Sequence, residues 1–402
     1  MKKFTYEARD KSNNETVSSM VQAESETSAA KLLIEQGLMP LELKEINEEG
    51  SFIGRITNRI TTKDRIVFLR QLSTLIGAGL PLAQSLHTVL EQTQNKKMQR
   101  IVEEVIAEVE GGHALSEAFG KHPEVFDKIV LALVAAGEVS GTLDEALKRV
   151  ATQKEKDAAM MSKIRGAMIY PAIVLLVILG VMIFMLLTVV PQVAKLYEDM
   201  DKQLPILSLI MITVANFLIT FWPLVIGLLV IGGYFLRQYL KTEGGIKAKD
   251  TLKLNVPLFS GMFRKLYMAR FSRTGQTLLS TGVAMLDMLR ISSESVNNVV
   301  ISAGIDRASE KVKGGKALSV ALKPEEYILP MVPQMIKIGE QSGKIDEMMG
   351  KTAQVYEDEL DEEIRSISTA IEPVLMVVLA VFAGGMVGAI LFPIYSLVGG
   401  IS

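Results

Sequence analysis

The sequence has 402 residues, a formal net charge of −2 and no cysteine. The balanced charge provides no bulk field to attract nucleic acid, and the absence of cysteine excludes disulfides and zinc–thiolate sites. A mean hydropathy of +0.30 is too high for an ordinary soluble protein, yet 22% charged residues are too many for membrane spans alone. The composition therefore predicts a mixture of membrane spans and soluble domains.

The first 46 residues predict a small α+β module of the order ββαβ. Short alternating apolar patterns at 4–8, 17–23 and 40–46 predict strands, and the helix-like segment 28–36 lies between the second and third. The chain begins with polar residues and shows no apolar core of a signal peptide, so this module is expected in the cytoplasm. The segment 47–60, with two glycines and a serine, is expected to be a linker.

Residues 61–165 predict a cytoplasmic bundle of about six short helices. In 101–109 the apolar residues recur at i, i+1, i+4, i+5 and i+8 with glutamates between them, the pattern of an amphipathic helix. Further helices are expected to be separated by Gly79-Leu80-Pro81 and by glycines at 111, 112, 120 and 137. About 100 residues can bury a core of their own, and the last helix is expected to continue into the first span.

The motif Gly-Glu-x-Ser-Gly occurs at 137–141 and again at 339–343. One glycine of the motif is expected to end one helix, and Ser140 or Thr142 to cap the next. Two interpretations remain open: a tight turn between helices, or a rigid corner whose charged tip docks a partner protein. The partner-docking candidates are Gly137, Glu138, Ser140, Gly141, Gly339, Glu340, Ser342 and Gly343.

Three long segments without a charged residue predict membrane-spanning helices at 166–194, 203–236 and 373–398. Each exceeds the roughly 20 apolar residues that cross the hydrocarbon core. Pro223 lies near the middle of the second segment and predicts a kink, because proline removes a backbone donor. Because the spans hold no Asp, Glu, Lys, Arg or His, the sequence argues against a pump or an ion-coupled transporter.

The charges beside the spans predict their orientation. Six basic residues precede the first span within 20 positions, and five follow the second, whereas the hairpin 195–202 has more acidic than basic residues. The positive-inside rule then places both basic flanks in the cytoplasm and the hairpin outside. The N-terminus is therefore expected in the cytoplasm, and the C-terminus outside. An outer hairpin of eight residues also argues against a receptor with an outer sensory domain.

A duplication relates the two halves of the chain. Phe68 and Phe271 are 203 positions apart, as are Gly79 and Gly282, and the two Gly-Glu-x-Ser-Gly motifs are 202 apart. A second cytoplasmic helical bundle is therefore expected at 264–370, followed by its own span. The second span returns the chain to the cytoplasm, so the two repeats share one orientation, unlike inverted transporter repeats.

Two features of the last helix allow alternatives. Small residues four positions apart in the third span permit close helix packing, either within the chain or between copies of it. The acidic run 357–363 predicts either a solvated helix face or a docking stripe for a basic partner. The candidates for packing in and beside the spans are Ala380, Gly384, Gly388, Pro171, Glu372, Pro373 and Pro393.

No catalytic residue, cofactor site or metal site is predicted. The segment 313–317, Lys-Gly-Gly-Lys-Ala, lacks the spacing of a phosphate-binding loop. The three histidines, His87, His113 and His122, have no metal-binding spacing and are expected to be exposed or capping residues. The chain is therefore expected not to be an enzyme.

The chain resembles the type II secretion system protein F family, which includes inner-membrane platform proteins of type IV pilus assembly. The resemblance covers nearly the whole sequence. It rests on residues 68–72 (Phe-Leu-Arg-Gln-Leu), 79–82 (Gly-Leu-Pro-Leu), both Gly-Glu-x-Ser-Gly motifs, 371–373 (Ile-Glu-Pro) and 392–394 (Phe-Pro-Ile). The second repeat departs from the family at Gly282-Val283-Ala284, where proline usually follows the glycine, and a looser helix entry is expected there.

The resemblance implies a scaffold without enzymatic activity, which links a cytoplasmic hexameric assembly or retraction ATPase to pilin or pseudopilin. It also implies other inner-membrane machine components and membrane lipid as partners, homo-oligomerisation, and no nucleic acid. The pilus, secretion and competence machines stay open as alternatives. The implied mechanism is that ATPase strokes move the two bundles, and that the helices continuous with the first and third spans carry this motion into the bilayer.

Overall fold

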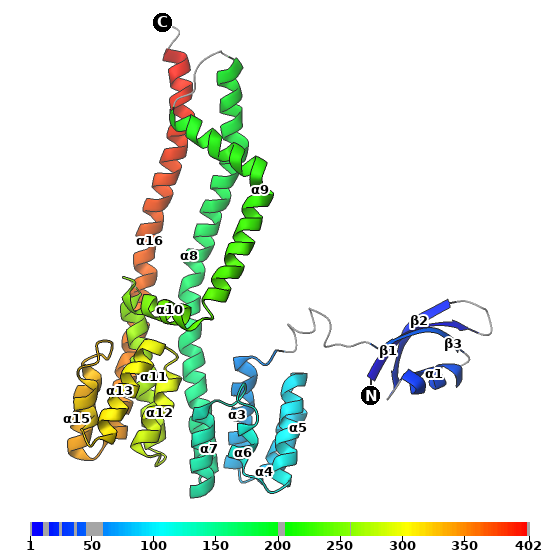
Figure 1. The fold of residues 1–402 in the computed structure, drawn as a ribbon, viewed down its shortest axis with the longest axis vertical. Helices are drawn as coiled ribbons and strands as arrows, with labels where there is room; N and C mark the ends of the chain where they lie inside the picture. Colours follow the sequence, from blue (N-terminus) through cyan, green and yellow to red (C-terminus); the bar gives the residue numbers. More distant parts are fainter. Residues whose placement is uncertain are drawn as a thin grey trace. The chain divides into compact units, whose positions relative to one another are not determined.

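The computed structural model describes residues 2–10, 16–23, 26–35, 38–45, 59–199, 206–257 and 259–399. They contain 15 helices and one three-stranded sheet, which confirms the mainly helical fold (Figure 1). Internal contacts divide the chain into two compact units, and each is described by itself. The first comprises 1–68 and 86–107, and the second comprises 69–85 and 108–402.

The first unit begins with the sheet. Its strands are β1 (Lys2–Asp10), β2 (Thr16–Ala23) and β3 (Leu38–Glu45), and α1 (Glu26–Glu35) lies between β2 and β3 in the chain. The strand order is β2-β1-β3 with both pairs antiparallel, and a register shift lies between Glu7 and Ala8. Most of the expected linker lies outside the described residues, which resume at Arg59.

Three helices of the first bundle follow: α3 (Thr62–Gly77), α4 (Leu82–Gln92) and α5 (Lys96–Glu110). The prediction of an amphipathic helix at 101–109 is confirmed by α5. Its residues Ile101, Val102, Val105 and Ile106 are buried, and the glutamates between them are not. Asn95 caps this helix, since its Oδ1 accepts bonds from the backbone N–H groups of Lys97 and Met98 at 3.0 and 3.1 Å.

The second unit contains two very long helices. After α6 (Leu115–Gly120) and α7 (Lys128–Ser140), helix α8 (Leu143–Asp199) continues without interruption for 57 residues. Then come α9 (Ile206–Tyr239), α10 (Glu243–Asn255), α11 (Ser260–Leu279), α12 (Met285–Ser295), α13 (Val299–Lys313), α14 (Leu318–Leu322), α15 (Met331–Ser342) and α16 (Ile345–Gly399), the last with 55 residues. The last helix of each bundle continues without a break into an apolar segment that is long enough to span a membrane, as expected.

Helices α8, α9 and α16 are long and apolar enough to cross a membrane. The expected kink in the second is present, because Phe221, two residues before Pro223, leaves helical geometry with φ −108° and ψ 17°. Helix α8 continues to Asp199, so the first part of the expected hairpin is helical. Residues 200–205 lie outside the described residues.

The two repeats, α3–α8 and α11–α16, have six helices each and share their turns. Positive φ values occur in equivalent pairs, at Gly79 and Gly282, Gly112 and Gly315, and Gly141 and Gly343. The looser helix entry expected after Gly282 is not observed. Val283 N–H donates to the Leu278 carbonyl at 3.1 Å, as Leu80 N–H does to the Leu75 carbonyl, so the turn closes without the proline.

Candidate functional site at the junction of the repeats

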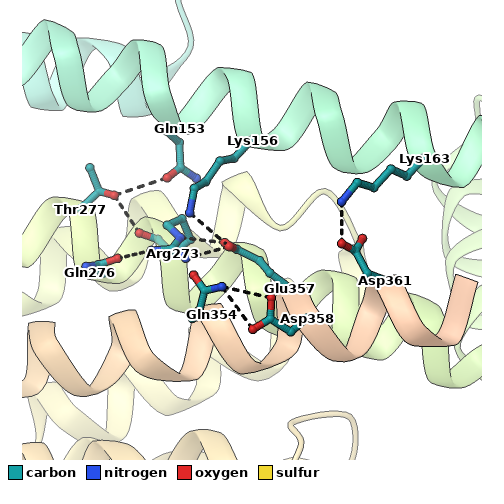
Figure 2. A network of polar contacts seen from close by, with 10 residues as sticks. All are labelled: Gln153, Lys156, Lys163, Arg273, Gln276, Thr277, Gln354, Glu357, Asp358 and Asp361. Atoms are coloured by element: carbon teal, nitrogen blue, oxygen red, sulfur yellow. Dashed lines mark hydrogen bonds and ion pairs between the residues drawn. The ribbon is translucent and has the colours of Figure 1, made fainter.

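Helices α8, α11 and α16 pack against one another within the second unit. Helix α8 ends the first repeat, whereas α11 and α16 begin and end the second. The side chains between them form a network of charged and polar groups, here called the junction (Figure 2). Two of the three helices with candidate membrane spans, α8 and α16, therefore meet before they reach their apolar segments.

Glu357 of α16 is at the centre of the junction. Its Oε1 accepts from Arg273 Nε and its Oε2 from the second terminal nitrogen of Arg273, both at 2.8 Å. Lys156 Nζ of α8 donates to the same Oε2 at 3.2 Å. The side chains of Arg273 and Glu357 are only 15% and 14% exposed, so this bidentate pair is largely shielded from water. One carboxylate thus links both repeats.

A second link lies one turn further along α16. Lys163 Nζ of α8 donates to Asp361 Oδ2 at 2.5 Å. On the α11 side, Lys265 Nζ is 2.6 Å from Glu363 Oε2 and 3.4 Å from Glu359 Oε2. Residues four apart on a helix share a face, so one face of the acidic run meets α8 and another meets α11.

This arrangement differs from both interpretations of the acidic run. Four of its six acidic residues form ion pairs inside the chain: Glu357, Glu359, Asp361 and Glu363. Glu357 and Asp361 contact the first repeat, whereas Glu359 and Glu363 pair with Lys265 of the second repeat. Most of the run is therefore engaged in ion pairs inside the chain rather than forming a solvated face or a free docking stripe. Lys156 and Lys163 are seven apart and so share a face of the helix that leads to the first span, but this spacing does not identify their acidic partners.

The bidentate ion pair is itself duplicated. Arg70 lies 203 positions before Arg273, and Glu155 lies 202 positions before Glu357. Arg70 Nε donates to Glu155 Oε1 at 2.8 Å, and a terminal nitrogen of Arg70 contacts Oε2. The hydrogen bond from Arg70 lowers the pKa of the Glu155 carboxyl below its ordinary value. Arg70 belongs to the motif at 68–72, and its sequence context predicted no role for its side chain.

The glutamates of the two Gly-Glu-x-Ser-Gly motifs hold short helices in place. Glu138 Oε2 accepts from Ser116 N–H at 3.1 Å and from Ser116 Oγ at 2.5 Å. Glu340 accepts from Ser319 N–H and Oγ at 3.1 and 2.5 Å. Each carboxylate therefore accepts hydrogen bonds at the start of α6 or α14, where the first backbone N–H groups of a helix have no partner within the helix. The structure thus gives both glutamates an internal role, and partner docking at these corners remains a prediction.

Gly137 does not end a helix, contrary to the expectation for that residue, and neither does the equivalent Gly339. Gly137 lies inside α7, where an added Cβ would be 2.6 Å from Ala146 Cβ and 3.1 Å from Leu143 Cα. At Gly339 the added Cβ would be 2.7 Å from Ile345 Cα. The helix ends instead at Gly141 and Gly343, whose φ values of 74° and 70° favour glycine. The first glycine permits the close approach of the next helix.

The serines of the motifs face outward. Ser140 Oγ donates to the Ala136 carbonyl at 2.7 Å, and Ser342 Oγ donates to the Ile338 carbonyl at 2.9 Å. Both serines are exposed, and Val139 beside Ser140 is 92% exposed. Ser140 therefore bonds back into its own helix rather than capping the next.

The candidates in and beside the spans are dispersed over two helices. Pro171 is buried within α8, whereas Glu372 and Pro373 are exposed on α16 and Pro393 lies further along it. Ala380 is exposed, and an added Cβ at Gly384 or Gly388 would have no described atom within 4 Å. In the described part of the chain these glycines are thus not in close helix contact, and contact between copies remains a prediction.

The described residues contain no cluster of three or more side chains that could hold a metal ion. His87 and His113 are exposed and His122 is half-buried, and His113 Nδ1 lies 3.2 Å from Glu108 Oε2. The segment 313–317 forms a helix end, where Lys316 N–H donates to the Lys311 carbonyl at 3.1 Å.

Comparison with known proteins adds the family. The model of the type II secretion system protein F family matches residues 68–191 and again 271–393, and the model of its N-terminal domain matches 1–44. The chain is 37% identical to the type IV pilus assembly protein PilC of Thermus thermophilus, over 99% of each chain. It is 34% identical to PilC of Pseudomonas aeruginosa, over 91% of this chain and 97% of the relative. It is 33% identical to the type II secretion system protein F of Aeromonas hydrophila, over 94% and 98%.

Proposed function

Because the chain belongs to the type II secretion system protein F family, we propose that it is the inner-membrane platform of a type IV pilus assembly machine. The names of its relatives support this role, and they support the related type II secretion machine as the alternative. The proposed role is structural, with no reaction and no cofactor of its own. Its proposed partners are a cytoplasmic hexameric ATPase, pilin or pseudopilin, other inner-membrane components and further copies of the chain.

The observation that carries the proposal is the continuity of α8 and α16 from bundle to span. With 57 and 55 residues, each helix extends for about 80 Å, and an uninterrupted helix transmits displacement along its axis. The junction ties the two helices together at Glu357 and Asp361. A displacement of either bundle by the ATPase would therefore move both spans together and hand a pilin helix onward.

The test interrupts one helix within the junction. Seven glycine-rich residues are inserted after Ala159, which lies between Lys156 and Lys163 on α8. The variant is expected to reach the membrane in normal amounts and to lose filament assembly. Seven alanine-rich residues at the same place form the matched control, because they shift the same contacts by the same length but keep the helix rigid. Normal filaments in the glycine variant would contradict coupling through α8.

We further propose that the two Gly-Glu-x-Ser-Gly corners face the cytoplasm and dock the ATPase. The exposed serines and the basic flanks of the first two spans support this. Photo-crosslinkers attached to Ser140→Cys and Ser342→Cys in native membranes are expected to capture the hexameric ATPase. Capture of the protein itself alone would favour a turn without a docking role.

The same cysteine variants test the proposed orientation, with the N-terminus in the cytoplasm and the C-terminus outside. A membrane-impermeant thiol reagent is expected to label Ser140→Cys only after the cells are permeabilised. A cysteine at Tyr395, near the end of α16, is expected to react in intact cells. The reverse pattern would overturn the orientation.

A further inference from the structure

Helix α10 begins directly after the second candidate span. That span ends at Tyr239, and Thr242 caps α10 by accepting a bond from Gly245 N–H on its Oγ1 at 3.2 Å. The turn is so tight that a Cβ at Gly245 would lie 2.0 Å from the Tyr239 carbonyl oxygen. Figure 1 shows α10 crossing the direction of α8 and α16, between their apolar segments and the second bundle. If α9 spans the bilayer, α10 lies along its cytoplasmic surface.

One face of α10 is fixed to the second bundle. Asp250, which is 4% exposed, accepts a bond from Val299 N–H at 3.1 Å, and Asn298 Nδ2 donates to the Asp250 carbonyl at 3.3 Å. Arg264 donates two bonds to the carbonyl of the buried Leu254, at 3.2 and 3.1 Å. These contacts set the rotation of α10 about its axis, so its opposite face points away from the bundle.

The opposite face carries the pattern of a membrane-surface helix. Gly244, Ala248 and Leu252 are four apart and exposed, and Leu252 is 62% exposed. Lys247 and Lys249 lie on either side of this stripe, and both are exposed without an ion-pair partner among the described residues. Lys247 also borders the cavity between α10 and the second bundle, so it lies at the edge of the outer face. Apolar residues facing outward between lysines are unfavourable in water but suit the boundary between headgroups and acyl chains.

We propose that this outer face of α10 binds the anionic headgroups of the membrane that the spans cross. Leu252 and Ala248 enter the headgroup boundary, while Lys247, Lys249 and the preceding Lys241 reach lipid phosphates. Between Arg237 and Lys253 the chain has five basic and two acidic residues, which complements an anionic leaflet. The contact would fix the orientation of the second bundle relative to the bilayer. The inference rests on the proposed membrane placement but not on the identity of the machine.

The first test places a spin label at Leu252→Cys in the otherwise cysteine-free chain. The full chain is reconstituted in nanodiscs of phosphatidylglycerol and phosphatidylcholine, and collisions with oxygen and with a water-soluble nickel chelate are compared. Val230→Cys within α9, 66% exposed, is the lipid reference, and Val139→Cys, 92% exposed, is the water reference. The label at 252 is expected to resemble the lipid reference. Behaviour like that at 139 would overturn the proposal, and so would exclusion of both reagents, which would indicate a protein contact.

The second test concerns charge. The triple variant Lys241→Gln, Lys247→Gln and Lys249→Gln is expected to lower the retention of phosphatidylglycerol relative to phosphatidylcholine at least about fivefold, measured by mass spectrometry of the purified protein. The control triple, Lys148→Gln, Lys316→Gln and Lys323→Gln, removes the same charge from exposed positions elsewhere. Equal retention in both triples would overturn the proposal. Neither assay requires a pilus, so failure here is distinguishable from failure of the platform role.

Discussion

The same arginine–glutamate pair occurs in both repeats, but in different surroundings. In the first repeat the side chains of Arg70 and Glu155 are 36% and 41% exposed, whereas those of Arg273 and Glu357 are 15% and 14% exposed. In the second repeat Glu357 also contacts Lys156 of the other repeat. Duplication thus supplied two equal pairs, and tertiary packing made one of them a link between repeats.

The strongest test of the shared architecture concerns the first glycine of each corner motif. Replacing Gly339 with Ala would place a Cβ 2.7 Å from Ile345 Cα, a backbone atom that moves only if α16 shifts. We expect a loss of about 3 kcal/mol in stability, measured as thermal unfolding in detergent. Gly137→Ala should have a similar effect, because the added Cβ would lie 3.1 Å from Leu143 Cα in the backbone of α8. A change within experimental error would show that the corners are not closely packed.

The pairs themselves should separate the two repeats. Replacing Arg273 with Ala leaves the shielded Glu357 carboxylate with Lys156 alone, and we expect a loss of about 2 kcal/mol. Arg70→Ala removes the equivalent, more exposed ion pair of the first repeat, and its free energy of unfolding should fall by less than about 1 kcal/mol. Thermal unfolding of both variants in one detergent makes the comparison direct. Equal losses would contradict the special position of the junction pair.

The two repeats should also differ in how their stability depends on pH, because Glu325 of the second repeat stands where the first repeat has His122. Glu325, 203 positions after His122, is buried, which disfavours its ionised form. Hydrogen bonds from Arg307 at 3.1 Å and Lys311 at 3.2 Å nevertheless lower the pKa of its carboxyl below the ordinary value. Because the folded-state pKa is depressed, the stabilisation is present above the unfolded-state pKa of about 4.3 and is lost as pH falls through the folded value.

Glu325→Gln should therefore unfold at a lower temperature than the parent chain at pH 7, and the gap should close as pH falls below about 4. Unfolding temperatures between pH 3 and 7 measure this gap. His122→Gln is the matched control in the first repeat and removes no such carboxylate. A gap that stays constant with pH would show that the ion pairs of Glu325 do not stabilise the fold.

The smallest effect is expected at the edge of the contact between repeats. Lys128 of α7 and Glu294 of α12 form an ion pair at 2.7 Å, but their side chains are 59% and 44% exposed. Lys128→Ala should cost less than about 1 kcal/mol, and the loss should vanish at high salt because mobile ions screen exposed charges. Unfolding at two salt concentrations tests this. A salt-independent loss would show that this pair does not behave as a screened surface contact.

Local patterns predicted much of the fold. The apolar period at 101–109 located α5, Pro223 predicted the kink seen at Phe221, and the duplication predicted the paired turns. These features depend on residues close together in the chain or on a fixed offset. The role of Gly137 was predicted wrongly, because a glycine that ends a helix and one that admits a neighbouring helix look alike in sequence.

The sequence by itself determined the helical class, the three candidate spans and the duplication, because hydropathy and periodicity are properties of contiguous residues. Only the tertiary structure decided what the charges do. Arg273 and Glu357 are 84 positions apart, and Lys156 and Glu357 are 201 apart, so no local pattern could pair them. A charged residue that faces water and one that faces an opposite charge obey the same helical period, and only the packing of α8, α11 and α16 distinguishes them.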